Sequence, residues 1–279
     1  LARLLGASDF LWEDFIRLQY ENLLPLLGER HNRAPLSTPS DELGRRLDAE
    51  LERADTGEAK VQALNQFKDH ESYLIDADHI LQRDTDFFFL SHRLTRLADV
   101  VVDRAFRLAW NESVEEYGTP QSAGGLPAEY TVLGLGKMGG SALGYASDIE
   151  LMVVYSDHGE TTGSTRRDAI SNREFFERLV RRGTDAIQSR REAIFEVDLR
   201  LRPYGQDGPR AVHIESFIEY FGPTGKAHSA ERLALIRLRH VAGNEELGRH
   251  ITAIRDQLVY ESDSIQVAEI RSLRQRQAE

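Results

Sequence analysis

Three carboxylates occupy positions where two predicted strands carry a polar face. Asp148 and Glu150 are two residues apart at the start of the run 149–155, which is rich in strand-forming residues. Side chains two apart on a strand project from the same face, so the two acids are expected to lie together. Neighbouring carboxylates repel each other unless a cation lies between them. Asp198, on the polar face of a strand predicted over 193–202, can supply a third ligand.

These three carboxylates are ligands of the kind that bind a hard metal ion. Carboxylate oxygens suit Mg²⁺, which also takes oxygens from substrate phosphates. Three carboxylates can hold two such ions, which then clamp the attacking and leaving oxygens of a phosphoryl displacement. Asp148, Glu150 and Asp198 are therefore predicted to be catalytic residues and ligands of one or two Mg²⁺ ions, with Mn²⁺ as a substitute.

A second group of residues is suited to phosphate. The glycine-rich turn after the strand predicted at 130–136 exposes backbone amides that can approach an anion closely. A lysine in this turn adds a point charge, and two arginines on the Asp198 face offer planar forks for phosphate oxygens. The predicted phosphate and nucleotide contacts are Lys137, Gly139, Gly140, Ser141, Arg200 and Arg202.

Each of these signals has a simpler interpretation when taken alone. An Asp-x-Glu pair is more often one exposed strand face, and the arginines of 178–191 suit a solvated helix. The glycines also resemble a dinucleotide fingerprint, but that motif opens a helix and is followed about 20 residues later by a single acid. Here an acidic strand follows almost at once. The nine histidines show no metal-ligand spacing and are predicted to be structural.

The elements that must position these residues are predicted from hydrophobic periodicity. Apolar residues recur every three or four positions in 41–54, after Ser40 as a cap, and in 90–109, which predicts helices. A loop at 31–40 and a linker at 118–127 are rich in Pro or Gly. Strands are predicted at 130–136, 149–155 and 193–202, with an amphipathic helix at 170–188 and helices after 203.

These elements predict an α+β protein. We expect a helical region at 1–128, a small mixed-sheet nucleotidyltransferase core at 129–222 and C-terminal helices at 223–279. Because the chain begins with Leu and ends in an unfinished helical pattern, we interpret it as a fragment of a longer protein.

Composition limits the class of partner. The formal net charge is −11, from 46 acids against 35 bases, and the arginines concentrate between residues 166 and 210. A nucleic-acid-binding domain usually presents a basic face, so a small phosphorylated substrate is favoured. No apolar run approaches the ~20 residues that a membrane helix needs. There is no Cys and no signal-peptide pattern, which fits a cytoplasmic protein without membrane attachment.

Two long motifs carry a resemblance to a known family. The segment 136–151 reads GKMGGSALGYASDIEL, and the segment 195–209 reads FEVDLRLRPYGQDGP. Together they resemble the polymerase-beta-like nucleotidyltransferase superfamily and, more specifically, the glutamine synthetase adenylyltransferase family. The block ERLALIRLR at 231–239 is similar as well, although Ala230 replaces the family's usual Trp. The resemblance is strong over about 130–243 and looser over 1–128.

The resemblance implies a function. Enzymes of this family carry two related halves that regulate glutamine synthetase: one attaches AMP from ATP to a tyrosine, and the N-terminal half removes it by phosphorolysis to give ADP. Glutamine and a PII-type signal protein bias the balance. By this resemblance Asp148, Glu150 and Asp198 are the metal ligands, and Gly139, Gly140 and Ser141 lie beside the nucleotide phosphates.

The sequences of segment 202–209 and of the loop 157–159 resemble those of the AMP-removing half, so deadenylylation is predicted. The AMP-adding reaction is the alternative. Two other classes stay open. One is an inactive module that binds the synthetase or the PII-type protein, against which the intact acids argue. The other is a polymerase acting on nucleic acid, which the acidic balance disfavours.

Overall fold

The structure is a computed structural model, which describes residues 36–81, 86–144, 147–189 and 195–261 and the single positions 268, 271, 272 and 275. The chain divides into two compact units. One comprises Leu1–Val101 with Ser141–Tyr145, and the other comprises Val102–Gly140 with Ala146–Glu279. Helices and a mixed sheet occur together, so the predicted α+β class is confirmed.

The first unit contains α3 (Leu43–Glu52), α4 (Gly57–Leu81) and the beginning of α5 (Phe87–Tyr117). The predicted leucine stripe of α3 is buried. The predicted cap is wrong: α3 begins after Glu42 without a side-chain cap, because the carbonyl of Pro39 accepts the first amide protons and Ser40 lies within that turn. The predicted loop is described only from residue 36 onward, and its earlier part lies outside the described residues.

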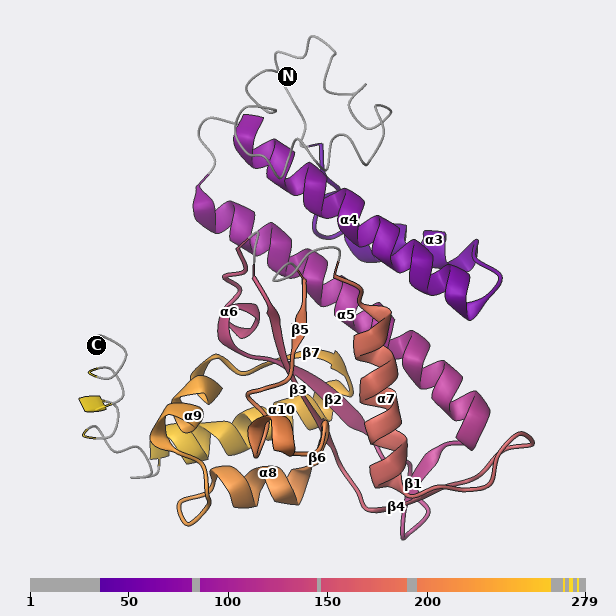
Figure 1. Ribbon diagram of the computed structural model, residues 1–279, viewed down its shortest axis with the longest axis vertical. Helices are drawn as coiled ribbons and strands as arrows, with labels where there is room; N and C mark the ends of the chain where they lie inside the picture. The colour runs from indigo at the N-terminus through magenta and orange to yellow at the C-terminus, as the bar shows by residue number, and fades with distance from the viewer. Residues whose placement is uncertain are drawn as a thin grey trace. The chain divides into compact units, whose positions relative to one another are not determined.

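The second unit is built on a five-stranded mixed sheet, in which β3 pairs with three other strands (Figure 1). β2 runs antiparallel to β3 and to β7. β5 and β6 both run parallel to β3 along its other edge, β5 at its beginning and β6 at its end. The bounds are β2 Tyr130–Gly134, β3 Ile149–Tyr155, β5 Val197–Asp198, β6 Ala211–His213 and β7 Arg239–Gly243.

Both faces of this sheet are covered by helices. On one face Tyr155 stacks on Phe176 of α7 (Asn172–Ala186), with ring centroids 4.6 Å apart. The opposite face contributes Met152 and Val154 to a core shared with α8 (Ile214–Phe221) and α10 (Glu245–Asp256). Figure 1 shows α7 on one side of the sheet and α8 and α10 on the other. Because both faces are covered, nearly every side chain of β3 is buried, which explains why its run is apolar almost throughout.

Short elements complete this unit. They are α6 Gly136–Gly139, α9 Ser229–Ala234, the 3-10 helices η2 Gly205–Asp207 and η3 Leu235–Arg237, and the π-helix η4 Gln257–Glu261. The predicted linker contains a strand, β1 (Pro120–Ser122), that pairs antiparallel with β4 (Gly159–Thr161). The C-terminal region predicted as helical contains β6 and β7. These strands are short and depend on pairing with distant partners, which periodicity does not reveal.

The strand predicted over 193–202 is the main correction within the core. Only Val197–Asp198 is a strand, residues 190–194 lie outside the described residues, and the chain turns at 200–201. Phe195 has a φ of 54°, which is incompatible with an extended strand. The apolar and polar alternation therefore does not define two faces beyond Asp198.

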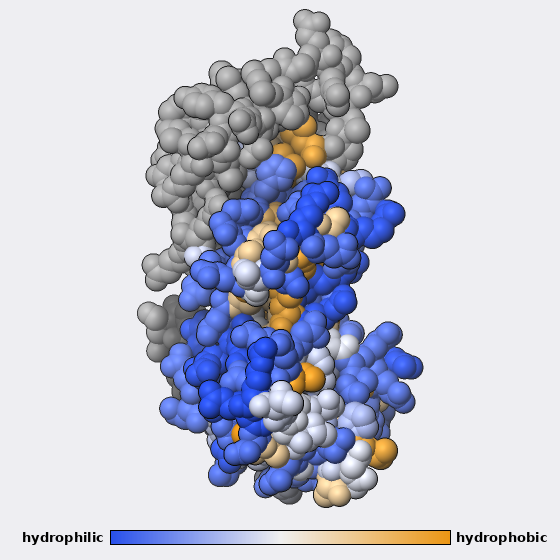
Figure 2. All heavy atoms as spheres, turned by 90° about the vertical axis from the view of Figure 1, so that its right-hand side faces the viewer, coloured by the Kyte–Doolittle hydropathy of each residue, from blue (hydrophilic) through white to orange (hydrophobic). Residues whose placement is uncertain are grey.

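The surface has the character that the composition predicts. Figure 2 shows a largely hydrophilic face with small, separate hydrophobic patches. Among the helices that the structure describes, none combines the length and apolar character needed to cross a membrane.

Candidate active site

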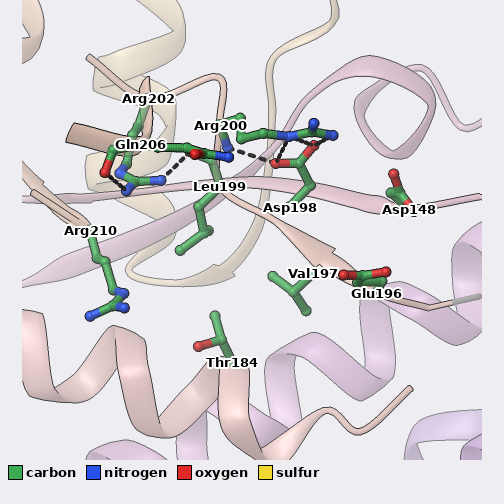
Figure 3. A pocket seen from close by; sticks show the side chains of 10 residues that line it. All are labelled: Asp148, Thr184, Glu196, Val197, Asp198, Leu199, Arg200, Arg202, Gln206 and Arg210. Atoms are coloured by element: carbon green, nitrogen blue, oxygen red, sulfur yellow. Dashed lines mark hydrogen bonds and ion pairs between the residues drawn. The ribbon is translucent and has the colours of Figure 1, made fainter. Parts of the chain in front are cut away.

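An open polar cavity of about 700 Å³ lies at the β5 edge of the sheet, next to the C-terminal end of α7. Figure 3 shows Asp148 and Glu196 toward one end, Arg202 and Arg210 toward the other, and the pair Asp198–Arg200 between them. The lining residues are Asp148, Thr184, Glu196, Val197, Asp198, Leu199, Arg200, Arg202, Gln206 and Arg210.

The sheet brings two of the predicted metal ligands next to each other. In the parallel pairing of β3 with β5, Glu150 lies opposite Asp198. Glu150 nevertheless does not line the cavity. Its carboxylate lies over the turn at Gly136, whose φ is 50°, and accepts the amide proton of Lys137 at 2.9 Å. A Cβ at Gly136 would collide with that carboxylate, so this glycine is required where it stands.

Asp198 is held by its neighbour Arg200. The guanidinium donates from Nε and Nη2 to Oδ2 at 2.8 and 2.6 Å, and the Arg200 amide donates to Oδ1 at 2.7 Å. Burial raises the pKa of Asp198, but the hydrogen bonds and charge of Arg200 outweigh it, and the pKa lies below its ordinary value. Asp198 is therefore a carboxylate at neutral pH. Asp148, in contrast, has no hydrogen-bond or ion-pair partner among the described residues.

The donor set fits a hard divalent cation in its chemistry. Asp148 and Asp198 present carboxylates to one cavity, and Glu150 is the neighbour of Asp198 across the strands. Their oxygens do not converge on one point while Arg200 holds Asp198 and the Lys137 amide holds Glu150. Metal binding at Asp198 competes with Arg200, which occupies both carboxylate oxygens, whereas the Lys137 amide occupies only Oε2 of Glu150.

The predicted phosphate turn is largely engaged in contacts of its own. The amides of Gly139 and Gly140 donate to the carbonyls of Leu135 and Gly136. A Cβ at Gly139 would collide with the backbone of Arg237, so close packing explains this glycine. Ser141 has a φ of 52° and belongs to the other compact unit.

Lys137 is exposed, and its Nζ donates to the Ser147 hydroxyl at 3.4 Å. The phosphate contacts expected of Lys137, Gly139, Gly140 and Ser141 thus stay predictions.

Arg202 has a structural role that the sequence did not suggest. Its guanidinium is buried and donates to the carbonyls of Leu199, Gln206 and Gly208 at 2.8–3.3 Å, which closes the loop 199–208. Most of its donors are used in this way, so it contributes charge to the cavity and few free hydrogen bonds. Burial, followed by the charge of Arg210, lowers the pKa of Arg202.

Arg210 is the cavity residue that sequence reasoning missed. It precedes β6, its side chain is exposed, and no described residue forms a hydrogen bond or ion pair with it. Its effect on the pKa of Arg202 shows that the two guanidinium groups lie close enough to repel. Only its position before an unpredicted strand brings it to the cavity, so no local motif could have identified it.

A histidine pair at the opposite end of β3 is a second arrangement that spacing did not predict. His158, His213 and Glu215 form the one group of three metal-ligating side chains among the described residues whose ligand atoms lie within 4.8 Å of one another. The two rings are stacked, with centroids 3.7 Å apart and planes at 16°. Stacked rings do not direct their in-plane lone pairs to a common point, so this arrangement is a packed pair and not a metal centre.

The segment 231–239, which carries part of the family resemblance, also stabilises the nearby backbone through hydrogen bonds. Glu231 accepts from the Tyr220 hydroxyl and the His228 amide, both at 2.8 Å. Arg232 is buried and donates to the carbonyls of Phe221 and Gly222 at 2.9 and 2.7 Å. Ala230, where the resembling family has Trp, is exposed. The block therefore fixes the segment after α8 and lies outside the residues that line the cavity.

Comparison with known proteins agrees with these motifs. The family profile described as glutamate-ammonia ligase adenylyltransferase matches residues 1–254. Among the relatives are proteins named bifunctional glutamine synthetase adenylyltransferase/adenylyl-removing enzyme. The protein from Methylococcus capsulatus is 34% identical over 91% of this chain and 27% of its own length. The protein from Pseudomonas aeruginosa is 31% identical over 92% of this chain and 26% of its own length. The chain thus spans about a quarter of these relatives.

Proposed function

Because the chain belongs to the glutamate-ammonia ligase adenylyltransferase family, we propose that it carries one of the two nucleotidyltransferase sites that the names of its relatives imply. We propose further that this site removes AMP from glutamine synthetase by phosphorolysis. The observation that carries the proposal is a single cavity with carboxylates at one end and arginines at the other, as Mg²⁺ and phosphate require (Figure 3). The direction of reaction is supported by the resemblance of 202–209 and 157–159 to the AMP-removing half.

The reaction joins phosphate to AMP and releases tyrosine. An oxygen of HPO₄²⁻ forms a bond to the phosphorus of the AMP group, and the bond from that phosphorus to the tyrosine oxygen breaks. The products are ADP and the unmodified tyrosine, whose oxygen takes the proton that the phosphate brought. When bound on Asp148, Glu150 and Asp198, Mg²⁺ supplies positive charge to the phosphoryl oxygens.

The chain's own residues have distinct parts in this scheme. Asp148 offers its carboxylate without competition from a described partner, and Asp198 becomes available when Arg200 exchanges it for an oxygen of the AMP phosphate. The exchange is favoured because Arg200 is an exposed fork that suits either anion. Arg202 keeps the loop 199–208 in place and adds positive charge. The glycine turn and Lys137 are proposed to contact the nucleotide phosphates.

Glutamine synthetase is the proposed protein substrate, and a PII-type signal protein is the proposed regulator. The names of the relatives also include the adenylyltransferase activity, so ATP-dependent addition of AMP is the second candidate. An inactive binding module is the third.

The test offers both reactions to the purified chain. AMP-modified glutamine synthetase is incubated with Mg²⁺ and inorganic phosphate, and ADP and unmodified enzyme are measured. In parallel, unmodified synthetase is offered with ATP and pyrophosphate is measured, with Asp148→Asn as the inactive control. Phosphate-dependent ADP without pyrophosphate supports the proposal. Pyrophosphate with AMP attached to the tyrosine makes the second candidate correct. Failure of both reactions, together with a silent Mn²⁺ titration, leaves the binding module.

A further inference from the structure

We propose that Arg210 forms a separate subsite that holds the inorganic phosphate before it attacks. This inference rests on the proposed function and deepens it, since it assigns the nucleophile to one end of the cavity. Arg210 was not among the residues expected to bind phosphate, and the two arginines that were expected there are already engaged.

The first step in the argument is the state of the three arginines. Arg200 is paired with Asp198 through Nε and Nη2, and Arg202 donates to three backbone carbonyls. Arg210 has an exposed guanidinium with no hydrogen-bond or ion-pair partner among the described residues, and it lines the cavity. Its donors are therefore the ones available to an incoming oxyanion.

The second step is electrostatic. The charge of Arg210 contributes to lowering the pKa of Arg202, whereas the charges of Glu177 and Asp198 oppose it. Two guanidinium groups that repel each other gain when a doubly charged anion lies between them or beside both. A phosphate dianion supplies that charge, whereas a neutral or singly charged group neutralises less of it.

The third step is the division of the cavity. Arg202 and Arg210 lie at the end away from Asp148 and Glu196 (Figure 3). An anion at the arginine end is removed from the repulsion of these acids, and a metal at the acidic end is removed from the arginines. Thr184, the lining residue from α7, donates its hydroxyl to the Val180 carbonyl at 2.9 Å, so its proton is already used within the helix and Arg210 is the charged donor at this end.

The same oxyanion has two sources, free phosphate and the β-phosphate of ADP, since the reaction converts one into the other. The α-phosphate of AMP is a different group and belongs near the carboxylates. Arg210→Gln is therefore expected to weaken the binding of inorganic phosphate and of ADP and to leave the binding of AMP unchanged. Removing a charge-assisted hydrogen bond weakens binding about tenfold to a hundredfold.

The variant is expected to fold, because Arg210 is exposed and no described residue depends on its side chain. Arg249→Gln is the matched control: it makes the same change at an exposed arginine of α10 that does not line the cavity. Arg210→Lys keeps the charge and removes the fork, and it should show an intermediate loss.

The experiment has a binding arm and a kinetic arm. In the binding arm, inorganic phosphate, ADP and AMP are titrated separately against the whole chain at constant ionic strength, and the shift in melting temperature is measured. In the kinetic arm, KM for phosphate and kcat are measured with AMP-modified glutamine synthetase. In the kinetic arm, we expect Arg210→Gln to raise KM for phosphate about tenfold or more with kcat little changed. In the binding arm, we expect it to lower the affinity for phosphate and for ADP.

Several outcomes overturn the inference. Phosphate binding unchanged in Arg210→Gln, an equal loss for AMP, or a rise in KM only for the modified synthetase each removes Arg210 from the phosphate subsite. The two proposals fail separately. If the wild-type chain releases no ADP, the proposed function fails while the binding arm still tests the subsite. If it releases ADP with KM for phosphate unchanged by Arg210→Gln, the subsite fails and the proposed function stands.

Discussion

The two ends of β3 contrast in how their polar groups are satisfied. At the beginning, Asp148 faces an open cavity without a described partner, and Asp198 of the adjacent strand is paired only with an exposed arginine. At the end, His213 is buried, stacks on His158 and caps α8 by accepting the Glu215 amide at 3.3 Å. Polar groups that a fold leaves available are candidates for chemistry, whereas satisfied ones stabilise the fold. From this contrast we propose that catalysis belongs to the beginning of β3 and stability to its end.

The largest expected effect comes from removing a charge at the catalytic end. Asp148→Asn should lower turnover at least about a hundredfold, because several kcal/mol of charge stabilisation at the metal are lost. The melting temperature should hold or rise slightly, since the repulsion among the acids decreases. Turnover and melting are measured together with Asp157→Asn, the same change just beyond the other end of β3. Near-normal turnover, or loss through unfolding, would remove Asp148 from the site.

The predicted third ligand, Asp198, should show its effect on metal binding itself. Asp198→Ala is expected to weaken Mn²⁺ binding about tenfold or more, given that even residues supporting a ligand cost this much. Asp207→Ala, an exposed acid in η2, is the control. Mn²⁺ is titrated with and without nucleotide. Equal affinities in Asp198→Ala and the wild type would mean that the third ligand lies elsewhere.

At the structural end, the effect should fall on stability. His213→Ala removes a helix cap and a buried ring that lies 5.2 Å from Tyr155, so the free energy of unfolding should fall by about 1–2 kcal/mol. Turnover per folded molecule should stay within about twofold. Denaturant unfolding and a deadenylylation assay check the two parts. A selective loss of turnover with unchanged stability would invert the comparison.

The smallest expected effect is a dependence of stability on pH. Burial, and then the charge of His158, lowers the pKa of His213, whereas Glu215, Asp157 and a hydrogen bond with the Ser156 backbone oppose this. The unfolded chain therefore takes up this proton first, near the ordinary value of about 6.5. Stability contributed by neutral His213 is present above that pH and decreases as the pH falls below it.

The corresponding comparison uses His213→Gln. Its stability should depend less on pH between about 7.5 and 5 than that of the wild type, measured by denaturant unfolding at each pH. Asp198 acts in a different window: its lowered pKa stabilises the folded chain above its ordinary value of 3.8, and that contribution is lost only as the pH falls further. Equal slopes for the wild type and His213→Gln between pH 5 and 7.5 would contradict the assignment.

Local sequence determined the elements whose own pattern is strong. The run 149–155 became β3 with the predicted bounds, and the amphipathic helix at 170–188 became α7, with Ser171 as its cap. Both signals depend on neighbours along the chain. The sequence placed these acids on polar strand positions, whereas the pairing of β5 with β3, which sets Asp198 opposite Glu150, is a finding of the structure.

Tertiary structure decided what the same residue types do once the chain is folded. Three arginines of one segment have three roles: Arg200 pairs with a carboxylate, Arg202 closes a loop through buried carbonyls, and Arg210 is left facing the cavity. Their sequence context is alike, so the difference arises from which carbonyls, acids and strands meet each guanidinium. Likewise Gly139 is explained by the backbone of Arg237 far along the chain. Such long-range contacts leave no periodic pattern in the local sequence. The sequence alone therefore indicates the type of chemistry, whereas the tertiary structure determines which residues are available for it.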